Sequence, residues 1–303
     1  PYTTLFRSPA WAYIKVADGC DNRCAYCVIP SIRGRYRSRP LRHIIGEAES
    51  LARAGVRELI LVAQNLTHYG KDLRDGTTLC TLLRALAAVG GIEWIRLHYL
   101  YPHEMTDELI DLIAEEPKIV KYLDIPLQHV NDAILRRMRR PETREQILGL
   151  LEKLRRRIDG VVIRTSLIVG LPGEGEAEFE ELMDFLKTQK LPRAGVFVFS
   201  PQEGTPAAEM TDRCTTEEAE ARRDALMALQ NRIMDEYDRE QIGRTFSVLC
   251  EGQDGEMFFG RRYADSPDID EQVFFTGGAF VPGTFAHVRI TGAGDGCLYG
   301  EAV

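Results

Sequence analysis

Three cysteines lie close together near the start of the chain: Cys20, Cys24 and Cys27, in a Cys-x3-Cys-x2-Cys pattern. Thiolates are soft ligands that bind iron–sulfur centres and zinc. Three of them on one loop can hold three irons of a 4Fe–4S cubane and leave the fourth open to a chelating substrate. A zinc site usually pairs two Cys-x2-Cys units, whereas here no second pair exists and His43 lies well beyond the loop. The pattern therefore predicts a 4Fe–4S cluster.

The other four cysteines are scattered singly, at Cys80, Cys214, Cys250 and Cys297. An odd total with one tight group does not resemble the disulfide framework of a secreted protein. We interpret the four as small core or surface residues and expect a reducing, cytoplasmic environment.

Short β-rich runs alternate with amphipathic helical patterns between residues 12 and 200. The expected strands are 13–17, 58–63, 94–99, 120–125, 161–169 and 195–199. The expected helices are 41–54, 78–89, 107–115, 143–157 and 176–188. Alternation of this kind predicts a parallel sheet with right-handed crossovers. Six units are fewer than the eight of a closed barrel, so we expect an α/β fold that is a partial, open (β/α)6 TIM-like barrel, with chemistry at the C-terminal strand ends.

A change of pattern near residue 241 predicts a second domain. A long helix is expected from about 216 to 241, followed by short strands separated by Gly and Asp turns at 245–250, 257–261, 272–275, 285–290 and 298–301. The predicted domains are therefore 9–241 and a small all-β, OB-like domain at 242–303. Residues 1–8 read like the translation of a sequencing adapter and are excluded from the fold prediction.

The charge of the chain indicates which kinds of partner it can bind. The net charge is −8 and no apolar run approaches the roughly 20 residues that span a membrane. From residue 243 onward the chain carries four Arg and no Lys against nine Asp and Glu. Such a surface repels a phosphate backbone and suits a basic protein partner, although an ordinary solvated acidic surface is the alternative. Nucleic acid is therefore not expected as the direct substrate.

The cysteine segment also resembles a known family. Asp18-Gly19-Cys20-Asp21-Asn22-Arg23-Cys24, with Tyr26 before Cys27, resembles the signature of the radical S-adenosylmethionine (SAM) superfamily. The stretches 29–34 and 37–40 resemble its methylthiotransferases, and most closely the RimO type, which modifies an aspartate of ribosomal protein S-twelve. The resemblance runs from about Pro9 to the C-terminus, where the small β-domain resembles a TRAM domain.

The resemblance, together with the polar strand ends, suggests further site residues. Residues expected to bind SAM are Tyr26, Gln64, Asn65, Gln128, Arg164, Gly170 and Pro172. Residues expected to face the substrate are Arg33, Tyr99, Tyr101 and His129. The structural alternatives are a packing aromatic at Tyr26, a strand-end cap at Gln64 and Asn65, a cation that merely solvates the loop at Arg33, and a structural hydrogen-bonding histidine at His129. Asn65 resembles the tRNA-modifying branch, whereas the Tyr99-Leu-Tyr-Pro run resembles RimO.

The activity implied by the resemblance is radical β-methylthiolation of an aspartate. One SAM donates a methyl group, and a second SAM is cleaved reductively to give the radical that abstracts hydrogen, with electrons from a donor such as flavodoxin or ferredoxin. The family carries a second cluster in an N-terminal domain that this sequence does not contain. We therefore expect the chain to bind one cluster and cleave SAM without completing sulfur insertion. The rivals are a tRNA adenosine methylthiotransferase of the MiaB type and a non-catalytic binding module stabilised by zinc.

Overall fold

A six-stranded parallel sheet organises the first part of the protein. The computed structural model describes residues 8–303, so the predicted artefact at 1–8 lies outside it except for Ser8. The strands stand in the order β1-β4-β5-β6-β7-β8, and each neighbouring pair is parallel. Their bounds are Trp11–Lys15, Glu58–Val62, Trp94–Leu97, Ile119–Asp124, Val162–Val169 and Arg193–Val198. The partial barrel predicted from the alternating pattern is confirmed.

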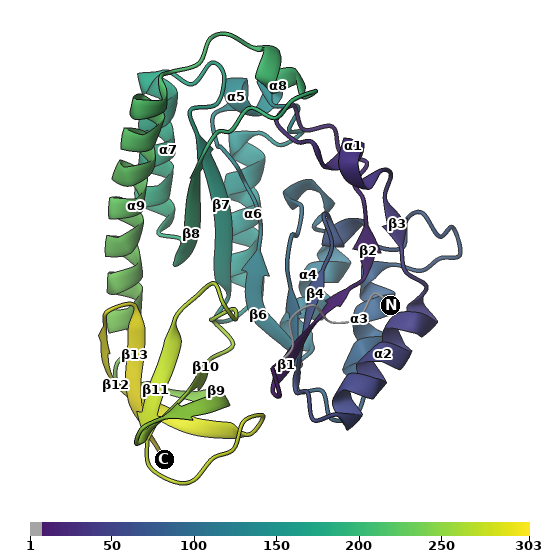
Figure 1. Ribbon diagram of the computed structural model, residues 1–303, viewed down its shortest axis with the longest axis vertical. Helices are drawn as coiled ribbons and strands as arrows, with labels where there is room; N and C mark the ends of the chain where they lie inside the picture. The colour runs from purple at the N-terminus through teal and green to yellow at the C-terminus, as the bar shows by residue number, and fades with distance from the viewer. Residues whose placement is uncertain (1–7) are drawn as a thin grey trace.

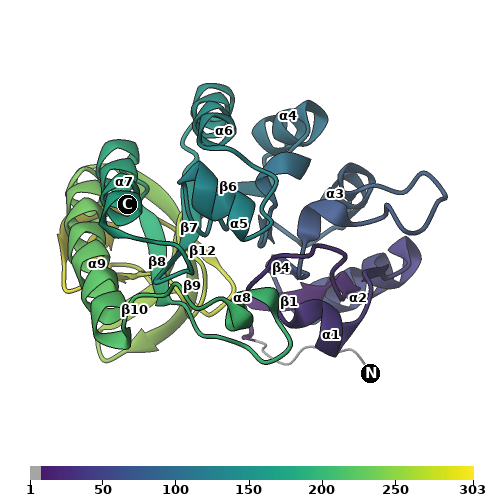
Figure 2. The ribbon, with the colours of Figure 1, turned by 90° about the horizontal axis from the view of Figure 1, so that it is seen from above.

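Helices cover the outside of this curved sheet, as the view from above shows (Figure 2). They are α2 (Leu41–Arg53), α3 (Leu79–Ala87), α4 (Asp107–Glu115), α6 (Arg144–Arg157), α7 (Glu176–Gln189) and the long α9 (Thr216–Arg239). Their apolar faces and the strands form one large buried core. The sequence prediction missed the short elements near the site: α1 (Ile29–Arg33), α5 (Asp132–Arg137), α8 (Pro206–Glu209), the two-residue strands β2 (Ala17–Asp18) and β3 (Arg37–Ser38), and the 3-10 helices η1 (Leu66–His68) and η2 (Pro102–Glu104).

Polar caps fix where several of these helices begin. Thr143 and Thr215 each open a capping box, in which the threonine accepts from the third helical N–H and the side chain there bonds back to the threonine N–H. A cap of this kind stabilises a helix by about 1 kcal/mol. Because α9 then buries Leu226 and Ile233 against β7, β8 and α7, its start also fixes how it lies along the sheet.

The C-terminal domain is a closed five-stranded barrel in the order β10-β11-β13-β12-β9. The strands span Thr245–Asp254 (β9), Met257–Arg261 (β10), Gln272–Thr276 (β11), Phe285–Gly294 (β12) and Cys297–Ala302 (β13). Val248, Phe275 and Val288 lie in its small apolar core. Figure 1 shows it below the sheet, at the foot of α9, whereas α1, α5 and α8 lie at the opposite end.

Buried ion pairs join the small barrel to the N-terminal ends of the core strands. Glu58, at the start of β4, accepts from Arg96 at 2.7 Å and from Arg261 of β10 at 2.6 Å. Arg193, at the start of β8, donates to Asp265 and Glu271, both at 2.9 Å. All of these residues are less than 9% exposed, so the two domains share one buried network of charges.

This network corrects the charge argument made from the sequence. The carboxyl groups of Asp265, Glu271 and Glu251 contact arginines inside the interface and contribute little to the outer surface. The exposed charges of the barrel are Asp254, Glu256, Asp268, Asp295 and Glu301, against Arg244 and Arg289. The outer surface therefore stays acidic, but less so than the count of charged residues predicts.

Over residues 8–303, the structure has no helix with the length and apolar character needed to cross a membrane.

Candidate iron–sulfur and cofactor site

The cysteine loop is closed on itself at the C-terminal end of β1. Gly19 has a φ of +78°, and a Cβ placed there would lie 2.2 Å from the carbonyl oxygen of Arg35, so only glycine fits. The Cys20 N–H donates to the Gly34 carbonyl at 3.2 Å, and the β2–β3 ladder holds both ends of the loop together. The short helix α1 fills the turn between them. The loop thus presents its thiols from a fixed backbone.

All three cysteines line one cavity of about 520 Å³. The other lining residues are Lys15, Tyr26, Ile29, Arg33, Val62, Ala63, Gln64, Tyr99, Tyr101, Pro126 and Gln128. Burial raises the pKa of the Cys20 and Cys27 thiols, and metal binding requires their deprotonation. Burial therefore favours the neutral thiol at Cys20 and Cys27, and a bound metal centre would favour their thiolates.

The thiols fit a cluster better than a single ion. Within residues 8–303, no three His, Cys, Asp or Glu side chains approach closely enough to hold one metal ion. Each thiolate of a cubane binds a different iron, so its ligands stand farther apart than those of zinc.

Six of the predicted cofactor and substrate residues meet in this cavity: Tyr26, Arg33, Gln64, Tyr99, Tyr101 and Gln128. The side-chain oxygen of Gln64 is buried and has no hydrogen-bond partner among the described residues. A buried amide without a partner costs free energy, so Gln64 is open to a polar ligand.

Two of these residues adopt a left-handed backbone, with φ of +62° at Tyr99 and +71° at Gln128. A non-glycine residue there costs about 1–3 kcal/mol and is typically found at binding sites. Gln128 is held by its N–H on Ser166 and by its carbonyl, which accepts from Ile168; the Tyr99 N–H donates to Asp124 at 3.3 Å. The surrounding structure thus enforces both orientations.

The structure does not bring Asn65 or His129 to the cavity lining. The Asn65 amide donates to Glu104 at 2.7 Å, and its oxygen caps the short helix Leu66–His68. His129 is 1% exposed; its Nδ1 accepts from the Asn131 N–H at 3.0 Å and its Nε2 lies 3.5 Å from Glu174. Both side chains contact neighbouring loop residues.

Arg164, Gly170 and Pro172 also lie outside the lining. Arg164 donates to Asp124 at 2.9 Å and lines a different cavity of about 400 Å³, which faces the small barrel. Gly170 turns with a φ of +73°, and a Cβ there would meet that of Ala219 in α9 at 2.8 Å. The Gly170-x-Pro172-Gly turn is therefore packed under α9.

Sequence reasoning missed two charged residues of the site. Lys15, the last residue of β1, lines the cavity and pairs with Asp18 at 2.9 Å. Its position at a C-terminal strand end is a signal that could have identified it. Arg140, which lies 116 positions from Cys24 in the chain, donates to the Cys24 sulfur at 4.0 Å; nothing in the sequence places it there.

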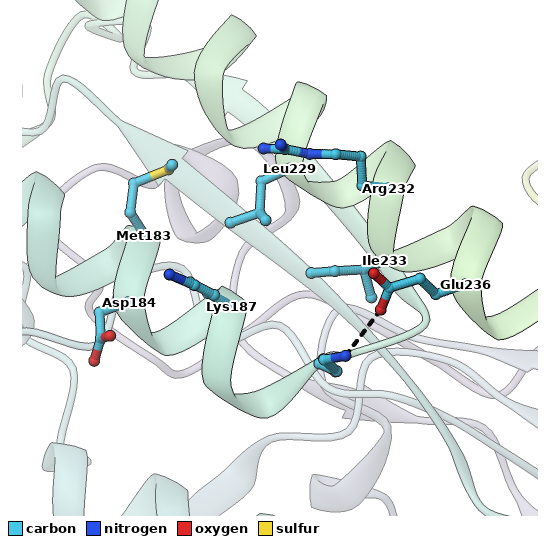
Figure 3. A pocket seen from close by; sticks show the side chains of 8 residues that line it. Met183, Asp184, Lys187, Leu229, Arg232, Ile233 and Glu236 are labelled. Carbon is cyan, nitrogen blue, oxygen red and sulfur yellow. Dashed lines mark hydrogen bonds and ion pairs between the residues drawn. The ribbon is translucent and has the colours of Figure 1, made fainter.

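A larger cavity, about 600 Å³, lies between α7 and α9. Met183, Leu229 and Ile233 form its apolar part (Figure 3), and Lys190 and Glu236, which form an ion pair, also line it. None of the predicted site residues lines it. It is a groove between two helices whose lining offers long charged side chains and no group suited to bind a cluster, so size alone does not identify the site.

Comparison with known proteins agrees with this geometry. The model of the radical SAM superfamily matches residues 14–186, and that of the TRAM domain matches residues 242–303. The chain belongs to the radical SAM superfamily. The ribosomal protein uS12 methylthiotransferase RimO of Pelobacter propionicus is 49% identical over 98% of this chain and 67% of its own length. RimO of Desulforudis audaxviator is 49% identical over 95% of this chain and 64% of its own length. These relatives place the chain in the RimO group, of whose length it spans about two thirds.

Solved structures share the fold at low identity. The radical SAM methyltransferase TsrM from Kitasatospora setae superimposes with a TM-score of 0.54 at 21% identity, covering 65% of this chain and 38% of its own. Coproporphyrinogen III oxidase HemN from Escherichia coli gives 0.54 at 18% identity, covering 74% of this chain and 52% of its own. At such identities the likeness concerns the fold alone, and it agrees with the partial barrel.

Proposed function

We propose that this chain is the SAM-cleaving part of a methylthiotransferase that modifies an aspartate of ribosomal protein uS12. The observation that carries the proposal is the single cavity in which Cys20, Cys24 and Cys27 meet Gln64 and Gln128, in a chain 49% identical to RimO proteins. Cys20, Cys24 and Cys27 would hold a 4Fe–4S cluster, which when bound would supply the electron for reductive cleavage of SAM and so the means to remove hydrogen from an unactivated carbon.

The residues around the cysteines have assigned tasks in this proposal. The unpartnered amide of Gln64 and the side chain of Gln128 hydrogen-bond the polar groups of SAM. Tyr26 and Tyr101 wall the cavity and exclude water from it. Tyr99, which is 50% exposed, and Arg33 stand toward the substrate. Asn65, His129, Arg164, Gly170 and Pro172 support the lining from behind.

The acidic outer surface of the small barrel supports a protein substrate. Five exposed carboxylates stand there against two exposed arginines, a balance that attracts a basic protein and repels tRNA. A substrate on the ribosome places the enzyme in the cytoplasm. The reductive step needs an external one-electron donor, such as a flavodoxin or a ferredoxin.

Anaerobic reconstitution tests the cluster. We expect the wild-type chain to bind the four irons of one cluster and to form 5′-deoxyadenosine from SAM under dithionite. Cys24→Ala should lose deoxyadenosine formation at least 100-fold, because one iron loses its ligand. The control, Cys297→Ala in β13, should keep both properties. Zinc in place of iron, with no deoxyadenosine from the wild-type chain, would support the metal-stabilised module instead.

Mass spectrometry tests the substrate. In a strain lacking the gene, uS12 should lose a methylthio group from one aspartate while tRNA methylthiolation is unchanged. The reverse result would reassign the enzyme to the tRNA branch and leave the radical chemistry intact.

A further inference from the structure

A buried arginine lies directly against one of the three cysteines. Arg140 is 4% exposed, and its Nη1 donates to the Cys24 sulfur at 4.0 Å. Its Nη2 donates to the Pro126 carbonyl at 3.0 Å, and its guanidinium stands 4.8 Å from the centre of the Tyr101 ring. Arg140 is not among the residues that line the cavity. Its charge therefore acts on the cysteine and does not contact a ligand in the cavity.

The backbone around Arg140 fixes this approach. The Ala25 N–H, next to Cys24, donates to the Met138 carbonyl at 2.9 Å, and the Arg140 N–H donates to the Leu135 carbonyl at 2.8 Å. Arg140 also precedes Pro141, which restricts its backbone to extended conformations. The end of α5 and the cysteine loop are thus joined by main-chain bonds on either side of the contact.

A buried carboxylate balances the guanidinium. Glu142 is 5% exposed, its Oε2 lies 3.3 Å from the Arg140 Nε, and its Oε1 lies 2.8 Å from His103 Nδ1. Neither the Arg140 Nε nor the Glu142 Oε2 has a well-oriented hydrogen bond among the described residues. The hydrogen bond between the two side chains, from Arg140 Nη2 to Glu142 Oε1, is long at 3.5 Å, so Glu142 neutralises the guanidinium only in part and the remaining charge acts on the sulfur.

We propose that Arg140 raises the reduction potential of a cluster ligated by Cys24, and that Glu142 acts in the opposite direction; this rests on the proposed function. Reduction adds one electron from an external donor, and the added negative charge spreads onto the thiolate ligands. A cation and an N–H donor at a ligating sulfur stabilise that charge. Because the pair is buried, the interaction is screened less than at the surface. Arg140 is a positioning and tuning residue, not a catalytic one.

Redox titration followed by electron paramagnetic resonance, without SAM, tests the proposal on reconstituted wild type, Arg140→Gln, Arg140→Lys and Glu142→Gln. At the wild-type midpoint, we expect Arg140→Gln to lower the ratio of reduced to oxidised cluster at least tenfold, which is 59 mV for a one-electron couple. Arg140→Lys should stay within about threefold of wild type because the charge remains. Glu142→Gln should raise the ratio, since the opposing charge is removed.

If Arg140 tunes the potential, Arg140→Gln and Glu142→Gln should change the ratio of reduced to oxidised cluster in opposite directions. If the two residues are only structural, both variants should change the ratio in the same direction or leave it unchanged. Unchanged ratios with full iron content overturn the proposal. If Arg140→Gln does not retain iron, Arg140→Lys and Glu142→Gln still decide, because both keep a cation beside Cys24. A wild-type chain that assembles no cluster contradicts the proposed function itself, whereas a cluster that cleaves SAM with insensitive potentials contradicts only this inference.

Discussion

The two ends of the parallel sheet are built on opposite principles. At the C-terminal ends of the strands, thiols and amides face a cavity, the Gln64 oxygen lacks a partner, and Tyr99 adopts a left-handed backbone. At the N-terminal ends, Glu58 and Arg193 are buried and bonded across the domain boundary. At the C-terminal end, polar groups remain free to bind a ligand, whereas at the N-terminal end the charged groups bind one another. The difference separates chemistry from stability, as in closed (β/α) barrels.

The largest expected effect lies in the charge network at the N-terminal ends of the strands. Although burial disfavours its carboxylate, Arg261 and Arg96 hold the pKa of Glu58 below its ordinary value. Glu58→Gln leaves the buried Arg96 guanidinium without a carboxylate partner and leaves Arg261 with Glu251 alone. We expect the free energy of unfolding, measured in urea, to fall by about 3–5 kcal/mol.

The control is Glu108→Gln at the exposed Arg84–Glu108 pair, which should change stability by about 1 kcal/mol or less. A small effect at Glu58 would mean that the two domains do not depend on the shared charge.

A smaller effect on stability is expected from a change of pH, through Glu271 at the N-terminal ends of the strands. Burial raises the pKa of Glu271 to about 8, with Arg193 lowering it and Asp238 raising it. Between its ordinary value of 4.5 and about 8, the folded chain holds a proton that the unfolded chain has lost. Stability should therefore fall as pH rises through this window.

Glu271→Gln stays neutral, so its advantage over wild type should grow across the window by at least about 1.4 kcal/mol, the equivalent of one pKa unit. Thermal unfolding at about pH 6 and pH 8.5 measures this difference. Glu301→Gln, at an exposed position, is the control and should track wild type. Parallel curves for wild type and Glu271→Gln would show that Glu271 ionises normally.

The smallest effect on stability should come from the cavity end. Tyr99→Gly removes a half-exposed ring and relieves a φ of +62°, while glycine costs about 0.5–1 kcal/mol in chain entropy. The free energy of unfolding should change by about 1 kcal/mol or less. Because the Tyr99 ring lines the same cavity as the three cysteines, its loss opens that cavity to water, and SAM cleavage should fall at least tenfold in the same variant, whereas Tyr99→Phe keeps the ring and most of the rate. A loss of stability above about 2 kcal/mol would assign the ring to packing.

The sequence predicts the sheet and the cysteine loop well because both depend on local patterns. Alternating strands and helices allow few topologies, and the three cysteines lie on one short loop, within residues 20–27. Strand-end residues were harder to assign: Gln64 reaches the cavity and Asn65 beside it does not. Successive side chains of an extended chain point to opposite sides, and the sequence does not show which side faces the ligand.

The features that the sequence does not predict depend on contacts between residues far apart in the chain. Arg140 meets Cys24 only after the whole of β4 to α5 has folded between them. The number of acidic residues in the small barrel predicts a strongly acidic surface, but Asp265 and Glu271 contact Arg193 of the core. A count of charges cannot show which of them are paired and buried.

The Glu58–Arg261 contact also has a consequence for synthesis. Its partners are separated by 203 positions, so a ribosome completes the core strands long before Arg261 emerges. During that interval Glu58 and Arg96 remain without the third member of their network, and the lower edge of the sheet stays hydrated. The N-terminal ends of the core strands are then covered only after the small barrel has been made, so a nascent chain that stalls before residue 261 is a natural target for proteolysis.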